Sequence, residues 1–307
     1  MLFRFKKNIR KIFSWLSNFF MSTVFLNDFF LDEDEAKVSI NDSGYYYGDG
    51  FYEVILLYNG KLIDKELHFD RLMANFQRLY FKNYPSRDNI ISIVREVIEK
   101  NENKKNGSIY IQFTRGCTQR THEFKDLNLK PNMLVKINDL HKNNFNADVQ
   151  KWNCCIIEDP RRMNCEIKMI SLLPMVLAKY EAENNGYDDV IFYNSRFKTV
   201  SEGSSFNVFI VNQDGKIVTC PICNCILPGC TRMRVVKILK DNGYEIEERF
   251  YSKEELYNAK EVFLTASLKI NAITCVDGKR IYNGDAGEVT NFIHSKYLEF
   301  LESYIDE

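Results

Sequence analysis

The chain has 307 residues, of which 45% are hydrophobic and 27% charged. That length allows one large or two medium domains, each with its own hydrophobic core. The formal net charge of -1 gives no electrostatic reason to expect nucleic acid or acidic partners in general.

Residues 1–20 form a basic N-terminal extension that carries five Lys or Arg and no acidic residue. It also carries apolar residues at 13, 15, 16, 19 and 20, which fits a signal or targeting peptide, or an amphipathic helix at a membrane surface. The segment is too short and too polar to span a bilayer. A targeting or tethering role and a dispensable extension before a start at Met21 both stay open.

Residues 21–141 predict a smaller α+β domain. Two strands over 51–63 are joined at Asn59-Gly60, a strong hairpin signal. Apolar residues at helical spacing predict helices over 67–81 and 89–100. Strands are also predicted over 45–47, 108–116 and 133–139, and the polar, Asn-rich segment 142–152 is predicted to be a linker.

Residues 153–307 predict a larger domain in which strands and helices alternate. Helices are expected over 171–186, 231–243 and 288–305, and SKEE at 252–255 fits a capping box. Short β runs are DVIFYN, FNVFIV, KIVTC and EVFLTAS, and Asp277-Gly278 marks a further hairpin. Two α/β-type domains that meet at a linker form a natural cleft for a cofactor.

The nine cysteines have irregular spacings: 117, 154, 155, 165, 220, 223, 225, 230 and 275. An odd number without a spaced framework in a long chain predicts reduced thiols and a cytoplasmic protein. The run CPICNC at 220–225 resembles a metal-binding motif in composition. No second C-x-x-C and no H-x₃₋₅-H follows it, so we predict loop cysteines and no metal.

Two residues of the second half indicate a specific chemistry. Lys168 lies in NCEIK (164–168), and a lysine can hold an aldehyde cofactor as a Schiff base. Glu202 lies in SEGSSFNVF (201–209), and a carboxylate can keep a pyridine nitrogen protonated so that the ring accepts electrons. Either residue alone would be interpreted as an ordinary surface residue. The surrounding motifs therefore decide whether the two belong to a cofactor site.

Seven motifs occur in a fixed order along the chain: GYYYGDGFYE (44–53), HFDR (68–71), TRGCTQRTHEF (114–124), NCEIK, SEGSSFNVF, LPGCTR (227–232) and LTAS (264–267). Together they resemble the fold-type IV pyridoxal-phosphate-dependent aminotransferases, and most closely the D-amino-acid (D-alanine) aminotransferases. The resemblance runs from about Met21 to the C-terminus. It implies the two-domain fold of that family and pyridoxal 5'-phosphate as cofactor.

Position by position, the resemblance makes Lys168 the Schiff-base lysine and proton-transfer base, and Glu202 the partner of the pyridine nitrogen. It also implies a set of further cofactor contacts. The phosphate contacts are Arg71, the backbone of Cys230, Thr231, the backbone of Ala266 and Ser267. Tyr187 lies where branched-chain enzymes carry a tyrosine that binds the phenolic oxygen of the cofactor.

The substrate is indicated by Arg120 and His122. In D-amino-acid aminotransferases an R-x-H element reaches in from the partner subunit and, with a tyrosine matching Tyr52, binds the substrate α-carboxylate. The resemblance therefore implies a homodimer that converts D-alanine and 2-oxoglutarate to pyruvate and D-glutamate. The chain departs from the family pattern just after LTAS, and Lys269 there, near the rim of the active site, bears on which substrate side chains are preferred.

Three other interpretations stay open. A branched-chain L-amino-acid aminotransferase is the first alternative and an aminodeoxychorismate lyase the second. A protein that kept the fold and lost activity is the third, supported only by the basic segment 1–20.

Overall fold

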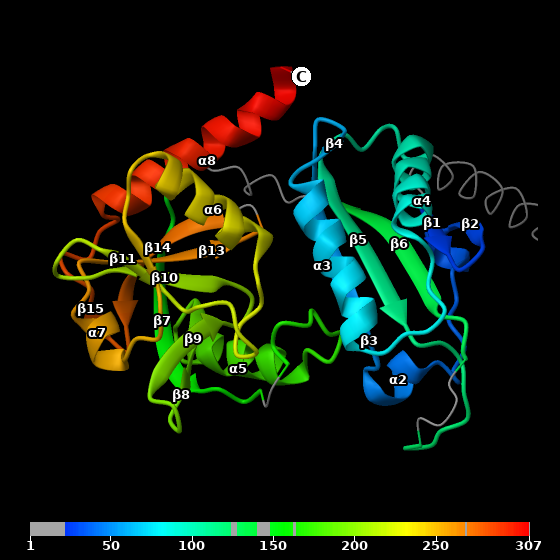
Figure 1. Ribbon diagram of the computed structural model, residues 1–307, viewed down its shortest axis with the longest axis horizontal. Helices are drawn as coiled ribbons and strands as arrows, with labels where there is room; N and C mark the ends of the chain where they lie inside the picture. The colour runs from blue at the N-terminus through cyan, green and yellow to red at the C-terminus, as the bar shows by residue number, and fades with distance from the viewer. Residues whose placement is uncertain (1–21, 124–127, 140–147, 162–163, 268, 307) are drawn as a thin grey trace, which may run out of the picture.

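The computed structural model describes residues 22–123, 128–139, 148–161, 164–267 and 269–306 (Figure 1). The predicted extension, residues 142–147 of the predicted linker and Leu268 lie outside the described residues. The described chain forms two sheets with helices against each, and the predicted two-domain fold class is confirmed. Among the described helices, none is both long and apolar enough to cross a lipid bilayer.

The first sheet is antiparallel, with the strand order β2-β1-β6-β5-β3-β4. Its strands are β1 (Thr23–Leu26), β2 (Phe29–Asp32), β3 (Gly50–Tyr58), β4 (Lys61–Leu62), β5 (Gly107–Thr114) and β6 (Asn132–Asp139). Its helices are η1 (Glu33–Glu35), α2 (Ser43–Tyr47), α3 (Lys65–Arg78) and α4 (Arg87–Lys100). Helices α3 and α4 cover the same face, because Phe76 of α3 and Val94 of α4 share one core with Phe51 and Ile111 of the sheet.

Strand β3 presents different residues to its two faces, since successive side chains of a strand point to opposite sides. Phe51, Ile55 and Leu57 point to α3 and α4. Leu56 points the other way, into a core shared with the second sheet, and Tyr52 lines a cavity on that side. Strand β3 therefore joins the two halves of the molecule.

The second sheet has the strand order β12-β11-β10-β13-β14-β7-β8-β9, with β15 beside β14. Its strands are β7 (Lys151–Glu158), β8 (Asp189–Asn194), β9 (Thr199–Gly203), β10 (Asn207–Val211), β11 (Ile217–Thr219), β12 (Ile246–Glu248), β13 (Glu261–Ala266), β14 (Lys269–Val276) and β15 (Lys279–Arg280). Strand β7 runs parallel to β14 and β8, and β11 runs parallel to β12. Glu202 of β9 also pairs with Asn207 of β10, so six of these strands close into a ring.

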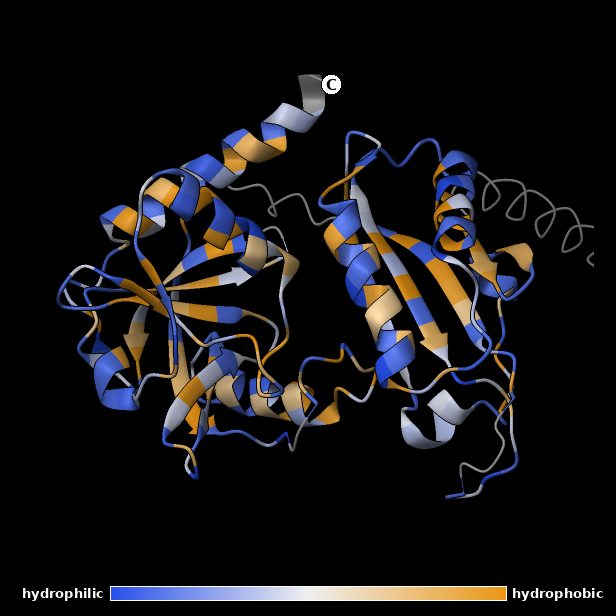
Figure 2. Cartoon of the chain, viewed as in Figure 1, coloured by the Kyte–Doolittle hydropathy of each residue, from blue (hydrophilic) through white to orange (hydrophobic). Residues whose placement is uncertain are grey.

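Four helices belong to this second half: α5 (Leu173–Asn184), α6 (Cys230–Asp241), α7 (Lys253–Tyr257) and α8 (Glu288–Asp306). Helices α6 and α8 pack over Phe209 and Phe263, whereas Val208 and Leu264 point into the ring. Figure 2 shows strands that are largely hydrophobic and helices that carry both hydrophobic and hydrophilic residues. The buried Asp64, just before α3, pairs with Arg234 of α6 and so links the two halves.

Most predicted elements are present, within a few residues at each end. Asn59 and Gly60 have φ of 47° and 78° and connect β3 to β4, as the hairpin signal predicts. Ser252 caps α7 by accepting a hydrogen bond from Glu255 N at 3.2 Å. Pro174 occupies the first turn of α5, where a missing N–H removes no helical hydrogen bond.

Three predictions need correction. Residues 45–47 belong to the short helix α2 rather than a strand, because Asp42 caps it by accepting from Gly44 N. Lys151 and Trp152 lie in β7 rather than in the linker, because β7 pairs with both β14 and β8. Cys223 and Cys225 form a disulfide rather than two free thiols, since the loop brings their Cα atoms to 5.4 Å. The domain boundaries themselves stay a prediction.

Candidate active site

A cavity of about 610 Å³ lies between the two sheets. The first half contributes Tyr52 and Arg71, and the second half contributes most of the remaining wall. The predicted site residues that line it are Tyr52, Arg71, Lys168, Glu202, Cys230, Thr231, Ala266 and Ser267. Motifs that are separated by more than 200 residues in the sequence therefore meet at one place.

Lys168 is held beside Tyr52 by backbone pairing. The Lys168 carbonyl accepts a hydrogen bond from Tyr52 N at 2.9 Å, and the next residue, Met169, bridges to Phe51. The Lys168 Nζ lies 4.4 Å from the centre of the Tyr52 ring, a cation–π contact. The loop that carries Lys168 is thus an extra edge segment of β3, which fixes the lysine at the cavity wall.

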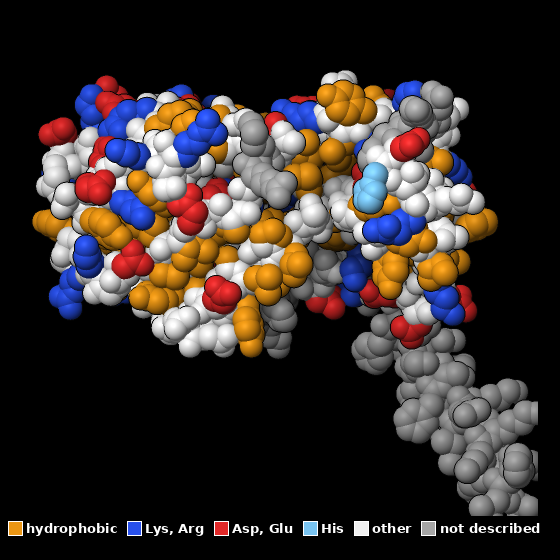
Figure 3. All heavy atoms as spheres, turned by 90° about the horizontal axis from the view of Figure 1, so that it is seen from below, with side chains coloured by type: hydrophobic (Ala, Val, Ile, Leu, Met, Phe, Trp, Pro, Cys, Tyr) orange, Lys and Arg blue, Asp and Glu red, His pale blue; other side chains and the backbone are white. Residues whose placement is uncertain are grey.

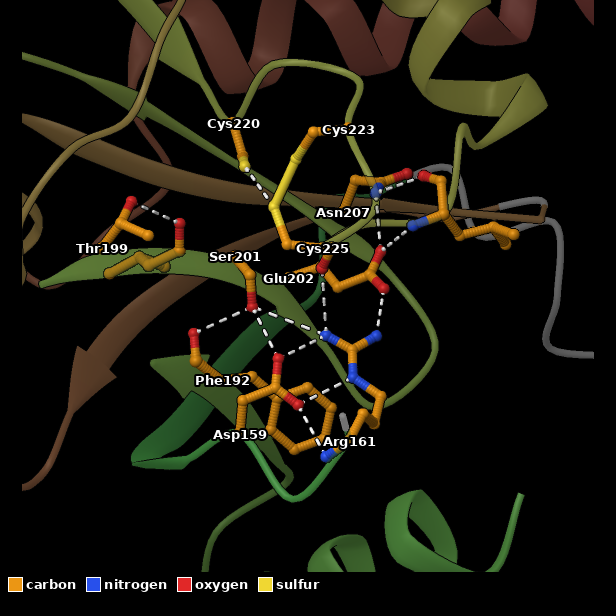
Figure 4. Close-up of a disulfide and its surroundings, with 12 residues drawn as sticks. Asp159, Arg161, Phe192, Thr199, Ser201, Glu202, Asn207, Cys220, Cys223 and Cys225 are labelled. Atoms are coloured by element: carbon orange, nitrogen blue, oxygen red, sulfur yellow. Dashed lines mark hydrogen bonds and ion pairs between the residues drawn. A yellow bond between two sulfur atoms is a disulfide. The ribbon is translucent and has the colours of Figure 1, made fainter. Parts of the chain in front are cut away.

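Glu202 is buried at the end of β9, and its carboxylate is held from three directions (Figure 4). Asn207 Nδ2 and Leu227 N donate to Oε2 at 2.9 and 3.0 Å, and Arg161 pairs with Oε1. Arg161 is fixed in turn by Asp159, with Nε and Nη2 at 2.9 and 2.8 Å from its carboxylate. Burial raises the pKa of Glu202 to about 7, although Arg161 and the Leu227 N–H oppose the rise.

Arg71 belongs to a buried charge cluster with Glu53 and His68. Its Nη2 and Nε lie 2.6 and 2.9 Å from the two Glu53 oxygens, and His68 Nδ1 lies 3.1 Å from Oε1. Burial alone would raise the pKa of Glu53, but the two cations hold it well below its usual range. Burial alone would lower the pKa of His68, but Glu53 and the hydrogen bond to Cys230 raise it to about 9.

The remaining Arg71 nitrogen, Nη1, donates to the Pro228 carbonyl at 2.7 Å. That bond ties Arg71 to the turn that opens α6, whose N-terminus therefore lies next to a buried cation.

We expect Glu53→Ala to lower the free energy of unfolding by about 3–5 kcal/mol, because it leaves the buried Arg71 charge without its carboxylate. Urea unfolding would measure the change. The control is Glu66→Ala, which removes an exposed carboxylate that pairs with Arg87 and should cost at most about 1 kcal/mol. Equal losses for the two variants would show that Glu53 does not hold Arg71 in place.

The N-terminus of α6 has the properties of an anion site. Gly229 is the N-cap of this twelve-residue helix, and no side chain of the described chain caps it, so the N–H groups of its first turn are available to a ligand. Cys230 and Thr231 of that turn line the cavity. A Cβ at Gly229 would lie 2.3 Å from Asn207 Oδ1, so the turn requires glycine. Thr231 and Arg71 lie at the same end of the cavity wall.

Two buried hydroxyls in the cavity wall, Ser204 Oγ and Thr265 Oγ1, have no hydrogen-bond partner among the described residues. Buried polar groups without partners are uncommon, and a bound molecule would satisfy them. A lysine in the cavity wall, a buried carboxylate and a helix N-terminus beside a buried arginine fit an aromatic aldehyde with a ring nitrogen and a phosphate.

Tyr187 is not among the described residues that line the cavity, and its cofactor contact stays a prediction. Its side chain packs against the cluster of Ala178, Ala182, Val190 and Phe192. Helix α5, with twelve residues or roughly 18 Å of length, separates the loop that carries Lys168 from the turn before Tyr187.

Arg120 and His122 lie on an exposed loop and do not belong to the described lining of their own chain's cavity. Both contact Tyr47 of α2: the Arg120 guanidinium and the His122 ring are each 5.8 Å from the Tyr47 ring centre. The Tyr47 hydroxyl donates to the Thr121 carbonyl at 2.9 Å. The loop thus holds an arginine and a histidine together at the surface.

The sequence analysis did not identify the residues that position Arg71 and Glu202. Glu53 and His68 were inside quoted motifs, and their acidic and basic character beside Arg71 was an available signal. Arg161 and Asp159 had no local signal, because Glu202 is 41 residues further along the chain than Arg161.

Comparison with known proteins gives three findings. Residues 50–274 match the amino-transferase class IV family model. The chain is 35% identical over 284 residues to a D-alanine aminotransferase of Staphylococcus haemolyticus, covering 92% of this chain and 99% of that protein.

Solved structures of the same fold carry a different substrate name. A branched-chain aminotransferase from Thermoproteus uzoniensis with norvaline has a TM-score of 0.83 at 26% identity and covers 92% of this chain and 95% of that one. A branched-chain amino acid aminotransferase from Thermobaculum terrenum in its PLP-form (holo-form) has a TM-score of 0.78 at 23% identity, covering 92% and 94%.

Proposed function

The chain belongs to the class IV aminotransferases, and from this premise we propose that it transfers the amino group of D-alanine to 2-oxoglutarate. Enzymes of this class depend on pyridoxal 5'-phosphate, whose protonated ring, when bound, accepts the electrons that the substrate Cα–H bond releases. The products are then pyruvate and D-glutamate. The observation that carries the choice of substrate is the exposed pair Arg120 and His122.

Lys168 is proposed to hold the cofactor and, once a substrate amine has replaced it, to move the proton at the substrate Cα. Its placement against Tyr52 supports this role, because the amine and the phenol ring share one wall of the cavity. Glu202 is proposed to keep the ring nitrogen protonated. Asn207, Leu227 and Arg161 fix its carboxylate and leave it no freedom to turn away.

The phosphate is proposed to lie at the N-terminus of α6. Arg71 supplies positive charge there, Thr231 and Ser267 supply hydroxyls, and Cys230 and Ala266 supply backbone N–H groups. The ion pair with Glu53 supports this arrangement, since it orients Arg71 before any anion binds.

We further propose that two copies of the chain form a homodimer in which Arg120 and His122 enter the partner's cavity. Four residues of α5 at helical spacing, Leu173, Val176, Leu177 and Tyr180, are each at least 50% exposed. An apolar helix face of this kind commonly packs against another protein surface. Figure 3 shows hydrophobic side chains gathered on the underside of the half that carries α5.

One observation favours the alternative, a branched-chain L-amino-acid aminotransferase. The cavity wall includes the apolar side chains of Leu172 and Met175, which suit an aliphatic substrate. The relative at 35% identity is named a D-alanine aminotransferase, and this supports the D-amino-acid proposal instead.

We expect Arg120→Met to raise the KM for D-alanine by roughly 10- to 100-fold, because a charge-assisted hydrogen bond to the α-carboxylate contributes about 1.5–3 kcal/mol. Steady-state kinetics with 2-oxoglutarate would measure it. Arg196→Met is the control, because Arg196 is exposed on the turn between β8 and β9, and its KM should stay unchanged. An unchanged KM for Arg120→Met would remove Arg120 from the site.

Mixed dimers would show which chain supplies Arg120. A Lys168→Ala chain and an Arg120→Met chain are each expected to be impaired alone. If Arg120 acts on the partner's cavity, the mixed dimer contains one site with both native residues, and activity returns on mixing. Failure to recover activity in verified mixed dimers would place Arg120 at its own chain's cavity or at none.

A further inference from the structure

Three cysteine sulfurs converge on the loop between β11 and α6. The Sγ atoms of Cys220, Cys223 and Cys225 all lie within 4.8 Å of one another. Cys223 and Cys225 are joined in a disulfide, and Cys220 Sγ lies 3.9 Å from Cys225 Sγ (Figure 4). The sequence analysis predicted no metal because no second cysteine pair follows the run at 220–225. The loop nevertheless brings three sulfurs of that run together.

We propose that the reduced loop is a metal site that binds one thiolate-seeking cation, such as Zn²⁺, through Cys220, Cys223 and Cys225. The Cys223–Cys225 disulfide is then its oxidised, metal-free state. Zinc–sulfur bonds are about 2.3 Å long, so two thiolates that share one zinc ion lie roughly 3.8–4.0 Å apart. The separation of Cys220 and Cys225, 3.9 Å, already has this value.

The surroundings of the sulfurs suit an open, three-thiolate site. Cys220 is buried at the end of β11 and anchors the cluster, whereas Cys223 and Cys225 are half-buried. Ile222 and Asn224 between them are exposed, so a cation can enter from solvent. Among the described His, Cys, Asp and Glu residues no fourth one joins the group, which leaves the fourth position of a tetrahedral ion to water.

The same loop reaches the wall of the active-site cavity. Arg161 Nη2 donates to the Cys225 carbonyl at 3.3 Å, and Cys165 N donates to the Asn224 carbonyl at 3.0 Å. Two residues after Cys225, Leu227 N donates to Glu202. A bound cation would therefore hold the backbone that positions Glu202, but the metal site itself does not depend on the proposed substrate.

Oxidation would empty the site. With glutathione disulfide as the oxidant, Cys223 and Cys225 form a sulfur–sulfur bond and give up two electrons, which convert the oxidant to two glutathione thiols. In the metal-free protein the protons of the two thiols pass to the glutathione thiolates. In the zinc-bound protein the zinc ion leaves as the bond forms, and solvent supplies the two protons. Two of the three ligands are lost in this step, so zinc should be released.

The test uses reduced protein that is loaded with pyridoxal 5'-phosphate and stripped of metal. Zinc is added, and the zinc that stays bound after gel filtration is measured by elemental analysis. We expect about one zinc ion per chain, and we expect both Cys223→Ser and Cys225→Ser to lose it. These two variants avoid the buried Cys220, whose replacement could disturb folding. Cys275→Ser, a half-buried free cysteine in β14, is the matched control and should keep its zinc.

Two results would overturn the proposal. One is the absence of bound zinc in the reduced wild-type protein. The other is zinc that remains in both Cys223→Ser and Cys225→Ser, since the ion would then lie elsewhere. Glutathione disulfide adds a separate check: zinc should leave as mass spectrometry shows the disulfide forming, and zinc retained on the fully oxidised protein would contradict the link between the two states.

Discussion

Lys168→Ala is expected to abolish transamination, with kcat lower by about four orders of magnitude or more, since we propose that this one amine is both the cofactor anchor and the proton-transfer base. The visible absorbance of the lysine-bound cofactor should disappear as well. The fold should persist, because Lys168 is held to β3 through its backbone carbonyl, which alanine retains.

The control for this variant is Lys279→Ala, in β15. Lys279 is exposed and is not among the described residues of the cavity wall, so colour and kcat should stay close to wild type. A yellow, active Lys168→Ala protein would contradict the assigned role. A yellow Lys168→Ala protein that loses only its kcat would separate the proton-transfer role from the anchoring role.

Glu202→Gln is expected to lower kcat by about two to three orders of magnitude, the usual cost of removing one oriented electrostatic contact from a reacting group. Glutamine keeps the shape of the side chain and cannot carry the negative charge that keeps a ring nitrogen protonated. Stopped-flow and steady-state kinetics would measure the loss. Glu183→Gln, on the exposed side of α5, should leave kcat unchanged, and an equal loss in both variants would exclude a role for the Glu202 charge.

The same variant tests the pH dependence of the cofactor-free protein. Burial raises the pKa of Glu202 from 4.5 to about 7, so this carboxyl takes up a proton on folding. Its contribution to stability is therefore present below about pH 4.5 and is lost as the pH rises towards about 7, by roughly 3 kcal/mol in all. Urea unfolding between these pH values should show this decline in the wild type, and Glu202→Gln should show less of it.

Local signals in the sequence predicted local structure well. Asn59-Gly60 predicted the β3–β4 hairpin because a tight turn needs positive φ at both residues, and the structure has it. The order of the motifs around Lys168 predicted which residues share one cavity, and eight of the predicted residues line it. The hairpin signal lies within two neighbouring residues, whereas the shared cavity was predicted from the resemblance of the ordered motifs to a known family.

Long-range contacts could not be predicted in the same way. Strand β7 was not predicted. One reason is that its parallel partners, β8 and β14, lie about 35 and 120 residues away in the sequence. The bond of Arg161 to Glu202, 41 residues apart, also depends on how the closed ring of strands brings distant segments together.

We expect this aminotransferase to act on D-amino acids. The most direct test is to supply D-alanine and L-leucine separately to the purified protein, loaded with pyridoxal 5'-phosphate, with 2-oxoglutarate as acceptor. Chiral chromatography of the glutamate formed would complete the assignment. We predict turnover of D-alanine with formation of pyruvate and D-glutamate, whereas turnover of L-leucine alone, with L-glutamate as product, would contradict it.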